Sequence, residues 1–376
     1  MKRQVFLFVL LFFCITSASA QWENKASIKT RVMHYSFPEH SPLSGETYSI
    51  ISAPIRLMTQ KDWSSISAAV HYDFLYFFSV HQNFPGGEPV DDNFFDLTAI
   101  VSDQGKQLFL HRLDRLFLHY RGERLSAKFG RQALSWGHGL MFQVMDMFNP
   151  FSPVALDTDY KNGTDMLSSE WLFDNGDDAQ GLFVPRREAD NTGWDISGSS
   201  YAIKYHALLV DTDVDILVAR HREEEVVGVG FARPVKQSMW RLDVVMNRNA
   251  TTGTHNALVT NIDYSWVWFE HNFYGFVEYL YDEKGAREQG DITLIGKHLF
   301  ATSVRMELHP LVNASVGTIA NLEDQSGLGL FSLHYDWMQD FSLSGSITTP
   351  FGAKDSSFAG PMSTNSIFQL QLSAYF

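Results

Sequence analysis

The C-terminal half of the chain alternates apolar and polar residues with a period of two. Side chains of a β-strand point alternately to opposite faces, so this period predicts strands with one apolar and one polar face. The last ten residues show it most clearly, with the apolar set Phe368, Leu370, Leu372, Ala374 and Phe376 and the polar set Gln369, Gln371 and Ser373. An apolar outer face and a polar inner face are what a transmembrane β-barrel strand needs.

The same two-faced pattern recurs upstream, in segments of about 9–11 residues, the length of a membrane-spanning strand. Large apolar residues, including Trp, Phe and Leu, stay on one face through many successive segments. The strands of a soluble β-sandwich also alternate, but they rarely keep large apolar residues on one face through so many successive strands. The clearest of these segments are residues 240–247, 300–308, 312–316, 331–337 and 341–348.

Eighteen strands can be placed along the chain, an even number, as a single-chain bacterial barrel requires. Short polar turns and longer polar loops separate them in alternation, which is also typical of such barrels. If the two least regular segments, 165–173 and 225–232, were not strands, sixteen would remain. The predicted strands are 28–36, 46–58, 63–78, 107–120, 125–135, 165–173, 179–187, 199–209, 212–222, 225–232, 238–249, 256–268, 273–283, 297–308, 311–321, 326–337, 341–349 and 365–376.

The N-terminal 20 residues read as a signal peptide. Lys2 and Arg3 form a basic start, residues 5–15 are apolar but too short to span a bilayer as a helix, and 18–20 read Ala-Ser-Ala. An anchor helix is the alternative. A lipoprotein at Cys14 is disfavoured because Phe12 and Phe13 stand where small residues are needed. We therefore expect residues 21–376 to form one barrel domain.

Composition supports this class. Without Lys2 and Arg3, 27 basic residues face 43 acidic ones, a net charge of −16, which argues against nucleic acid as a partner. Cys14 is the single cysteine, so the mature chain would carry neither a disulfide nor a Cys-based metal site. Aromatic residues make up 14% of the chain, a richness that barrels use for girdles at both membrane interfaces.

The final strand resembles the closing strand of bacterial outer-membrane proteins, which typically ends in Phe. The resemblance implies the outer membrane of a Gram-negative bacterium as the location. It also implies that the barrel-assembly machinery recognises the chain through Phe376 and that outer-membrane lipid and lipopolysaccharide surround it.

One long segment, residues 136–164, breaks the strand pattern. It is rich in aromatic residues, Met, Pro and Gly, and runs through Trp136, His138, Phe142, Asp146 and Phe148. Loops longer than about 12–15 residues are usually functional or disordered. The apolar content argues against disorder, and it also argues against exposure to bulk water.

This segment carries a second resemblance. Gly130-Arg131-Gln132, Trp136-Gly137 and Asp146-x-Phe148-Asn149-Pro150 are similar to the motifs of porin-like proteins related to alginate-export and other substrate-specific barrels. The likeness covers about residues 113–167 and the final strand. It implies that loop 136–164 folds into the lumen and narrows it. The alternative is that the loop caps the barrel or packs on one inner wall.

Alternation also predicts which side chains line the lumen. Both signs of charge occur there, with neighbours of opposite sign such as Arg241 with Asp243 and Arg305 with Glu307. These charges either satisfy one another along a wet wall or orient a polar solute across the constriction. The inward candidates are His71, Asp73, Lys128, Gln132, Lys204, His206, Arg241, Asp243, Glu278, Arg305, Glu307, His334 and Asp336.

Arg131 is an exception to the inward set. The strand parity of its neighbours points it towards lipid, close to the external end of its strand. It could then extend to the membrane interface. Alternatively, a bulge turns it inward beneath the loop.

Enzyme chemistry is not expected. The sequence has no Gly-x-Ser-x-Gly elbow and no His-Glu-x-x-His pair, and its 14 His are scattered. Asp157-x-Asp159 with Asp165 lacks the rest of a calcium-binding loop, so no metal or other cofactor is expected. A cation held by these loop carboxylates is the alternative.

The leading hypothesis is therefore an all-β transmembrane antiparallel barrel that conducts small polar solutes passively. The aromatic residues of the loop would offer stacking faces to sugars or aromatic acids. Alternatives are a transporter of hydrophobic compounds, in which the loop forms an apolar pocket, and a non-conducting scaffold that anchors polysaccharide. The expected pore and constriction residues are Lys128, Gln132, Trp136, His138, Phe142, Asp146, Phe148, Asn149, Arg241, Asp243, Arg305 and Glu307.

Overall fold

The computed structural model describes residues 22–42, 44–81, 93–188, 193–360 and 363–376, so the expected signal peptide lies outside the described residues. In the described part of the chain all regular secondary structure is β, and no helix there is long and apolar enough to cross a membrane. The strands are β1 (Glu23–Ser36), β2 (Thr47–Ser52), β3 (Ile55–Asp62), β4 (Ile66–Ser79), β5 (Thr98–Asp103), β6 (Gln107–Arg121), β7 (Leu125–Gln132), β8 (Thr164–Leu172), β9 (Asp178–Arg187), β10 (Trp194–Leu209), β11 (Thr212–His221), β12 (Glu224–Val235), β13 (Ser238–Asn249), β14 (Gly253–Trp268), β15 (His271–Asp282), β16 (Ala286–Gln289), β17 (Ile292–Ile295), β18 (His298–His309), β19 (Val312–Asn321), β20 (Gly327–Met338), β21 (Phe341–Phe351) and β22 (Ile367–Tyr375).

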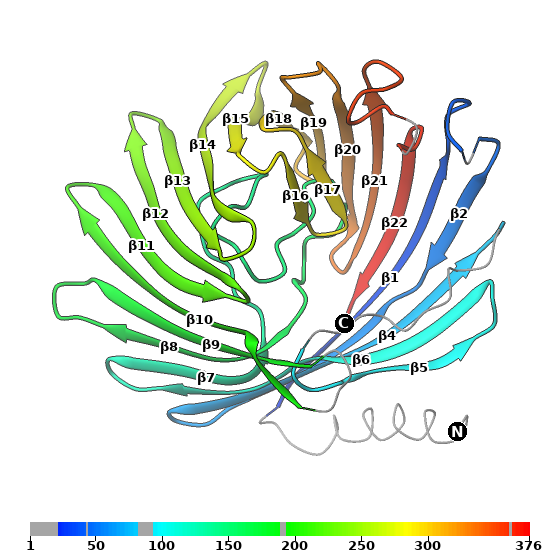
Figure 1. The fold of residues 1–376 in the computed structure, drawn as a ribbon. Helices are drawn as coiled ribbons and strands as arrows, with labels where there is room; N and C mark the ends of the chain where they lie inside the picture. The colour runs from blue at the N-terminus through cyan, green and yellow to red at the C-terminus, as the bar shows by residue number, and fades with distance from the viewer. Residues whose placement is uncertain (1–21, 43, 82–92, 189–192, 361–362) are drawn as a thin grey trace.

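These strands close into an antiparallel barrel (Figure 1). The last strand, β22, pairs with the first, β1, in a register that sets Ser27 opposite Tyr375 and His34 opposite Phe368. β2 and β3 share one wall position, because both pair with β1 on one side and with β4 on the other. β5, β16 and β17 lie within connectors. Eighteen wall positions remain among the described strands, as the alternation predicted.

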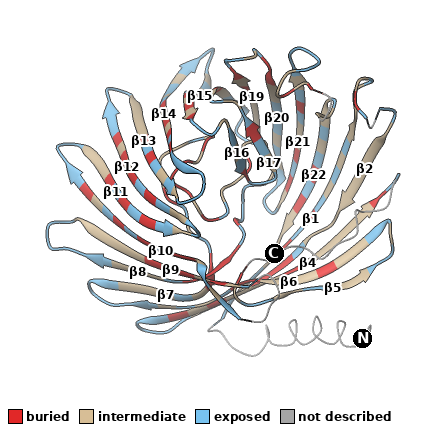
Figure 2. Cartoon of the chain, viewed as in Figure 1, coloured by how far each residue is buried: buried red, intermediate tan, exposed pale blue. Residues whose placement is uncertain are grey.

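Both of the least regular predicted strands are present, as β8 and β12. The predicted faces also hold. On β22 the apolar Phe368, Leu370 and Leu372 are exposed, whereas the alternate residues Gln371 and Ser373 are buried. Figure 2 shows this alternation of buried and exposed residues along many wall strands. A barrel with water or protein inside and lipid outside requires this inverted pattern.

The two rims of the barrel differ. One, here called the short-turn rim, carries tight connections such as Val210–Asp211 and Phe269–Glu270, whose four residues all have positive φ. Such left-handed turns match the twist of paired strands. Exposed aromatic side chains gather at this rim, namely Trp63, Tyr120, Trp171, Trp268 and Trp337. The opposite, long-loop rim carries the longer connectors, but β11 and β12 are joined there by residues 222–223 alone.

The apolar core of the protein lies inside the barrel. The segment 133–163, which joins β7 to β8, crosses the interior (Figure 1). Its Phe142 and Met145 are fully buried, and they belong to one cluster with inward residues of the wall such as Leu217, Val259 and Leu280. The inner wall from β9 to β19 is therefore partly apolar, because it is covered by protein and not by water.

Three local expectations were wrong. β7 ends at Gln132 and not at 135, because the chain turns into the lumen at Leu134, whose carbonyl O accepts from the Lys161 ammonium at 2.6 Å. The connector 79–106 contains an additional strand, β5, which pairs with β6. The connector 284–296 contains the hairpin β16–β17.

Candidate functional site

The inward-folded segment 133–163, called the lumen loop, is the candidate site. Its tight path depends on glycine at two positions. Gly137 has φ +91°, and a Cβ at Gly139 would clash with the carbonyl O of Phe142. The loop therefore reverses direction within a few residues and brings successive backbone N–H groups to face the wall.

One wall carboxylate holds this reversal. Glu278 of β15 accepts from the backbone N–H groups of Leu140, Met141 and Phe142 at 2.6, 2.8 and 2.6 Å. Asn261 on the neighbouring β14 donates to the same carboxylate at 2.9 Å and to the carbonyl O of His138 at 3.1 Å. Glu278 is almost fully buried, and these charge-assisted hydrogen bonds replace the water it has lost.

A second carboxylate anchors the preceding turn. Asp243 of β13 accepts from the backbone N–H of His138 at 2.6 Å and lies 2.8 Å from the ring Nδ1 of the same residue. The ring Nε2 is 3.6 Å from Asp215 of β11. Burial alone would lower the pKa of His138, but the hydrogen bond to Asp243 and the charges of Asp243 and Asp215 raise it above its ordinary value.

The distal part of the loop reaches the opposite wall. Lys29 of β1 donates to Asp157 at 2.7 Å and to Asp159 at 2.6 Å. Tyr375 of β22 donates to Asp159 at 2.8 Å, and the Arg56 guanidinium of β3 lies 4.4 Å from the ring centre of Tyr160. The lumen loop is thus attached to both sides of the barrel and spans the lumen between them.

The base of the loop is held by buried ion pairs. Lys161 pairs with Asp146 within the loop, and burial raises the pKa of that carboxyl and lowers the pKa of that ammonium. Arg115 of β6 donates to the carbonyl O of Lys161. Asp114 beside it accepts from the backbone N–H of Gly163 at 3.0 Å. Because Lys161 also donates to the carbonyl O of Leu134 at 2.6 Å, the two ends of the loop are held together beside β6.

Three aromatic residues of the loop are not available to a solute. Trp136, Phe142 and Phe148 are 5%, 0% and 3% exposed, and the indole N–H of Trp136 donates to Gln180 at 2.9 Å. Phe151 is half-buried. The prediction that these rings offer stacking faces is therefore wrong for the first three. Their apolar surface packs against the wall and so holds the loop in place.

The other predicted site residues lie on the inner wall or at the loop base. Lys128 lies over the ring of Phe117 at 5.9 Å. Gln132 is buried and donates to the carbonyl O of Met166 at 3.2 Å. Asn149 donates to Thr164 at 2.8 Å and so ties the loop to the start of β8.

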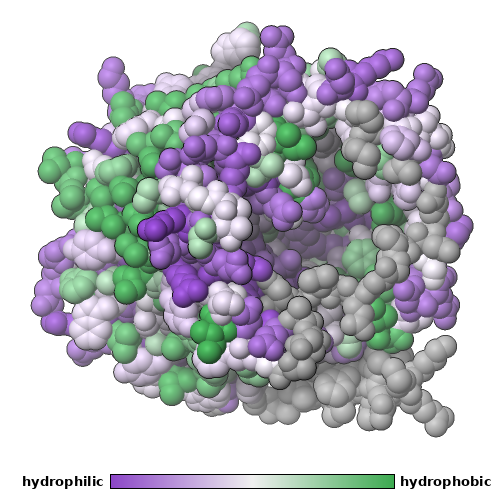
Figure 3. Space-filling view, viewed as in Figure 1, coloured by the Kyte–Doolittle hydropathy of each residue, from purple (hydrophilic) through white to green (hydrophobic). Residues whose placement is uncertain are grey.

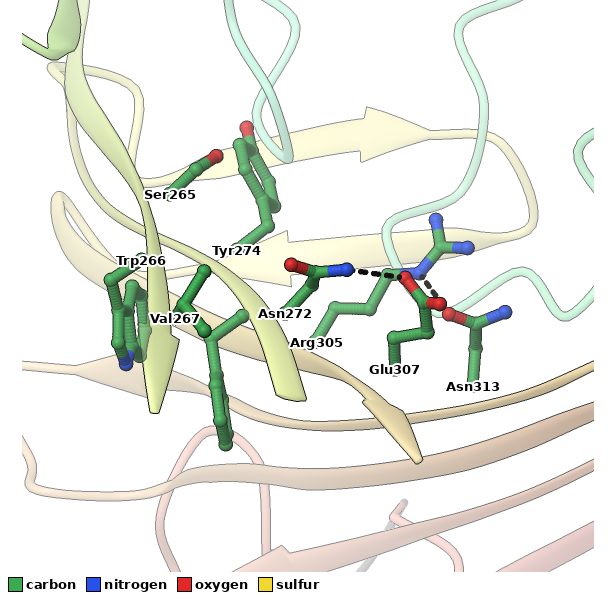
Figure 4. Close-up of a pocket in the computed structure, with 9 residues that line it drawn as sticks. Ser265, Trp266, Val267, Asn272, Tyr274, Arg305, Glu307 and Asn313 are labelled. Atoms are coloured by element: carbon green, nitrogen blue, oxygen red, sulfur yellow. Dashed lines mark hydrogen bonds between the residues drawn. The ribbon is translucent and has the colours of Figure 1, made fainter. Parts of the chain in front are cut away.

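The predicted charge pairs have other partners. Arg241 forms an ion pair with Asp263 at 2.9 Å, whereas Asp243 accepts a hydrogen bond from the backbone N–H of His138 in the loop. Arg305 donates to Asn313 at 3.3 Å, and Glu307 accepts from Asn272 at 3.0 Å. Figure 4 shows these four side chains gathered in a cavity of about 460 Å³ near the short-turn rim.

Arg131 neither extends to the membrane interface nor turns into the lumen. It is 3% exposed and lies where β7 leaves the wall. Its guanidinium donates to Asp165 of β8 at 2.8 and 3.0 Å and to the carbonyl O of Leu113 on β6 at 3.3 Å. It thus connects β6 and β8 directly, at the level where β7 has ended between them.

Water-accessible space remains beside the loop. Figure 3 shows a central hollow, with mostly hydrophilic atoms on the walls in view. Cavities of about 250 Å³ and 280 Å³ lie on two sides of the loop, the first bordered by His221, His255 and Lys284, and the second by Lys128 and Glu170. In the described residues no group of three or more His, Cys, Asp or Glu side chains is placed to hold a metal ion.

Sequence reasoning missed several residues that position the loop. Lys29 and Arg56 occupy inward positions of β1 and β3, so alternation could have found them. Gln289 on β16 could not have been found, because its role depends on a hairpin folded into the barrel. It donates to the carbonyl O of Met141 at 2.7 Å and of Phe151 at 2.9 Å.

No protein-family model and no curated protein matches the sequence. Solved structures do match the fold along nearly the whole chain. OccAB4 of Acinetobacter baumannii is similar with a TM-score of 0.63 at 11% identity, over 96% of this chain and 99% of that one. A BenF-like porin from Pseudomonas fluorescens gives 0.60 at 10%, over 94% and 98%.

A third similar structure is OccK2 (OpdF) of Pseudomonas aeruginosa, solved in complex with glucuronate. Its TM-score is 0.59 at 8% identity, over 94% of this chain and 98% of that one. At these identities the likeness establishes the fold. The chain has the closed eighteen-stranded architecture of porin barrels.

Proposed function

We propose that this protein is an outer-membrane channel through which small polar solutes diffuse passively. The observation that carries the proposal is the lumen loop, which is anchored by Glu278 and Asp243 on one wall and by Lys29 on the other. A loop held at both ends of its span narrows an eighteen-stranded lumen without filling it. Polar side chains along the remaining path would then select solutes by size, hydrogen bonding and charge.

The location belongs to the same proposal. Lipid-facing apolar strands support the outer membrane of a Gram-negative bacterium, with lipid and lipopolysaccharide around the wall. Phe376 would serve as the recognition signal for the barrel-assembly machinery. Its backbone is paired with Ala26 by two hydrogen bonds of 2.9 Å, so the pairing with the first strand extends to Phe376.

The competing functions fit less well. A transporter of hydrophobic compounds needs an apolar binding surface in the lumen, and Trp136, Phe142 and Phe148 are buried against the wall. An enzyme needs an arranged set of reactive groups, whereas the buried carboxylates Glu278 and Asp243 are occupied by loop hydrogen bonds. We therefore propose no catalytic activity. The glucuronate in the similar OccK2 structure makes sugar acids sensible first solutes to test.

The test is conductance of the purified barrel in planar bilayers, together with liposome swelling for sugars, sugar acids, amino acids and apolar solutes. Replacing residues 140–157 by a short Gly-Ser linker should raise the conductance and weaken discrimination between solutes. Deleting the exposed Lys354 and Asp355 from the connector of β21 and β22 is the control and should change neither. A barrel that carries no current before or after the replacement would instead be a non-conducting scaffold.

A further inference from the structure

A row of hydroxyl groups crosses the inner wall opposite the lumen loop. Strand register sets Ser315 of β19 opposite Ser332 of β20, and Ser332 opposite Ser346 of β21, near the middle of each strand. All three line one cavity together with the loop. Paired strands are about 4.8 Å apart, so the three hydroxyls follow one another at that interval. Ser303 of β18 and Thr348 of β21 lie at the two ends of the next row and line the same cavity.

This cavity, of about 190 Å³, has hydroxyls on the wall side and apolar side chains on the loop side. The loop side is formed by residues 153–156, which read Pro-Val-Ala-Leu and are half-buried. Among the described residues that line the cavity none is charged, in contrast to the cavities of about 250, 280 and 460 Å³. Arg305 stands opposite Ser315 in the register, but it donates to Asn313 at 3.3 Å and does not line this cavity.

In the part of the chain that the structure describes, the hydroxyls of this cavity have no hydrogen-bond partner. The next row towards the short-turn rim differs, because there Ser344 lies 2.8 Å from the ring of His334. Thr348 is only 6% exposed, and the Oγ of Ser346 is buried, so bulk water does not fully hydrate either group. A buried hydroxyl without a partner costs free energy, and a ligand hydroxyl that bonds to it removes this cost.

The loop side of the cavity is held in place at both of its ends. Before it, the carbonyl O of Phe151 accepts from Gln289 at 2.9 Å. After it, Asp157 accepts from Lys29 at 2.7 Å. The apolar residues between these anchors therefore stay opposite the hydroxyls, and the cavity has its shape before any ligand arrives. A site formed in advance loses less conformational entropy on binding.

We propose that this cavity binds an uncharged solute rich in hydroxyl groups, such as a neutral monosaccharide. The inference rests on the proposed function and names a substrate class for it. A sugar ring carries hydroxyls around its edge and C–H groups on its faces. Its hydroxyls can both donate to and accept from Ser315, Ser332 and Ser346, because a Ser hydroxyl does both. Its C–H groups would pack against Val154 and Leu156 of the loop.

An uncharged lining disfavours solutes that carry a carboxylate or an ammonium group. Moving an ion out of water costs far more than moving a hydroxyl, and here no opposite charge lines the cavity to offset that cost. D-Glucose and D-glucuronate make this difference measurable, because they share a ring and differ only in the carboxylate at the last carbon. We expect the hydroxyl row to contribute to the binding of the first and not of the second.

The test measures sugar binding to the purified barrel in detergent, by saturation-transfer NMR titration with D-glucose and, separately, with D-glucuronate. The double variant Ser332→Ala with Ser346→Ala removes two hydroxyls of the row and changes little volume. Ser168→Ala with Ser265→Ala is the matched control, because these two serines line other cavities, which contain charged side chains.

We expect wild type and control to bind glucose alike and the double variant to bind it at least tenfold more weakly, through the loss of about one hydrogen bond at each serine. Equal glucose binding by the two double variants, or none by the wild type, would overturn the proposal. A double variant that weakens glucuronate as much as glucose would overturn the assignment to uncharged solutes. If the double variant does not assemble, Ser332→Ala alone decides the matter, with about a threefold loss expected.

Binding in detergent requires no transport, so it separates this proposal from the proposed function. A wild-type barrel that binds glucose through these hydroxyls but carries no current in a bilayer would refute the channel and keep the sugar site. A conducting barrel whose glucose binding is the same in both double variants would do the reverse.

Discussion

The carboxylate of Glu278 accepts a hydrogen bond of 2.6 Å from the backbone N–H of Phe142, a residue 136 positions earlier in the sequence. Phe142 is fully buried against the wall on which Glu278 stands. One contact is polar and the other apolar, and both depend on the same short stretch of backbone. Docking of the lumen loop is therefore cooperative around this point.

We predict that Glu278→Gln loosens the loop without preventing barrel assembly. An amide offers one acceptor oxygen in place of two and turns its NH₂ towards a backbone N–H. Hydrogen bonds to charged groups contribute about 1.5–3 kcal/mol each, so docking should weaken by at least that amount. The measurement is the rate of chymotrypsin cleavage within residues 136–151 of the folded barrel.

Glu307→Gln is the control for this change. Glu307 lies on the same inner wall but accepts from the side chain of Asn272 and not from the loop. Its cleavage rate should match that of the wild type. Equal rates in all three proteins would mean that apolar packing alone holds the loop.

The raised pKa of His138 predicts pH-dependent docking. A group whose folded-state pKa is raised adds stability that is fully present below its ordinary value of about 6.5 and is lost as pH rises through the folded-state value. Current fluctuations from the loop should therefore increase as the pH is raised from 6 to 9. His138→Asn should remove this dependence, because it keeps a donor for Asp243 but does not titrate.

His119→Gln is the matched control for the pH series. His119 lies on the inner wall of β6, beside Ser126 at 2.9 Å. Its variant should show the wild-type pH dependence. If the wild-type fluctuations are constant from pH 6 to 9, the charge of His138 has no part in docking.

The Arg131–Asp165 pair predicts a large effect on wall stability. Removing one member of a buried ion pair typically costs about 3–5 kcal/mol, because the other charge is left buried, whereas replacing both by apolar residues is often neutral. Arg131→Leu should therefore lower the temperature at which the folded barrel unfolds in a heat-modifiability gel. The double variant Arg131→Leu with Asp165→Leu should recover most of the loss, and a double variant worse than the single one would contradict this account.

The faces of the closing strand can be tested directly. Leu370 is exposed on the lipid face of β22, and Gln369 beside it points into the barrel. Leu370→Arg should cost about 2–4 kcal/mol if the site lies near the membrane midplane, because a charge is then placed in lipid. Gln369→Arg should assemble at nearly the wild-type yield. Equal yields would place the strand in a register shifted by one residue.

Alternation in the sequence was sufficient to predict the wall. Even the weakly patterned β8 and β12 could be placed from their own alternation, although an even strand count alone would have allowed eighteen or sixteen. β5 and β16 could not. Residues 286–289 read Ala-Arg-Glu-Gln and have no apolar face, so nothing local marks them as a strand. They form a hairpin because the interior of the barrel supplies Met141 and Phe151 as partners for Gln289.

The site was predictable in position but not in detail. Composition shows that loop 136–164 must be covered, and the lumen offers the room. Composition does not show which of the aromatic rings the wall would bury. Alternation likewise puts Arg241 and Asp243 on one face, but the strand register sets Arg241 opposite Asn261 and within reach of Asp263. Partner choice across strands depends on register, which a single strand does not encode.

The attachment of the loop to the second wall has a consequence for the order of assembly. Asp159 accepts hydrogen bonds both from Lys29 of the first strand and from Tyr375 of the last. These three residues can meet only after β1 and β22 have joined, which is the contact most distant in sequence and the slowest to form. The hydrogen bonds of Asp159 therefore stabilise the closed state of the barrel. Until these strands join, Tyr375 cannot reach Asp159, and a partly closed barrel would be leakier than the finished one.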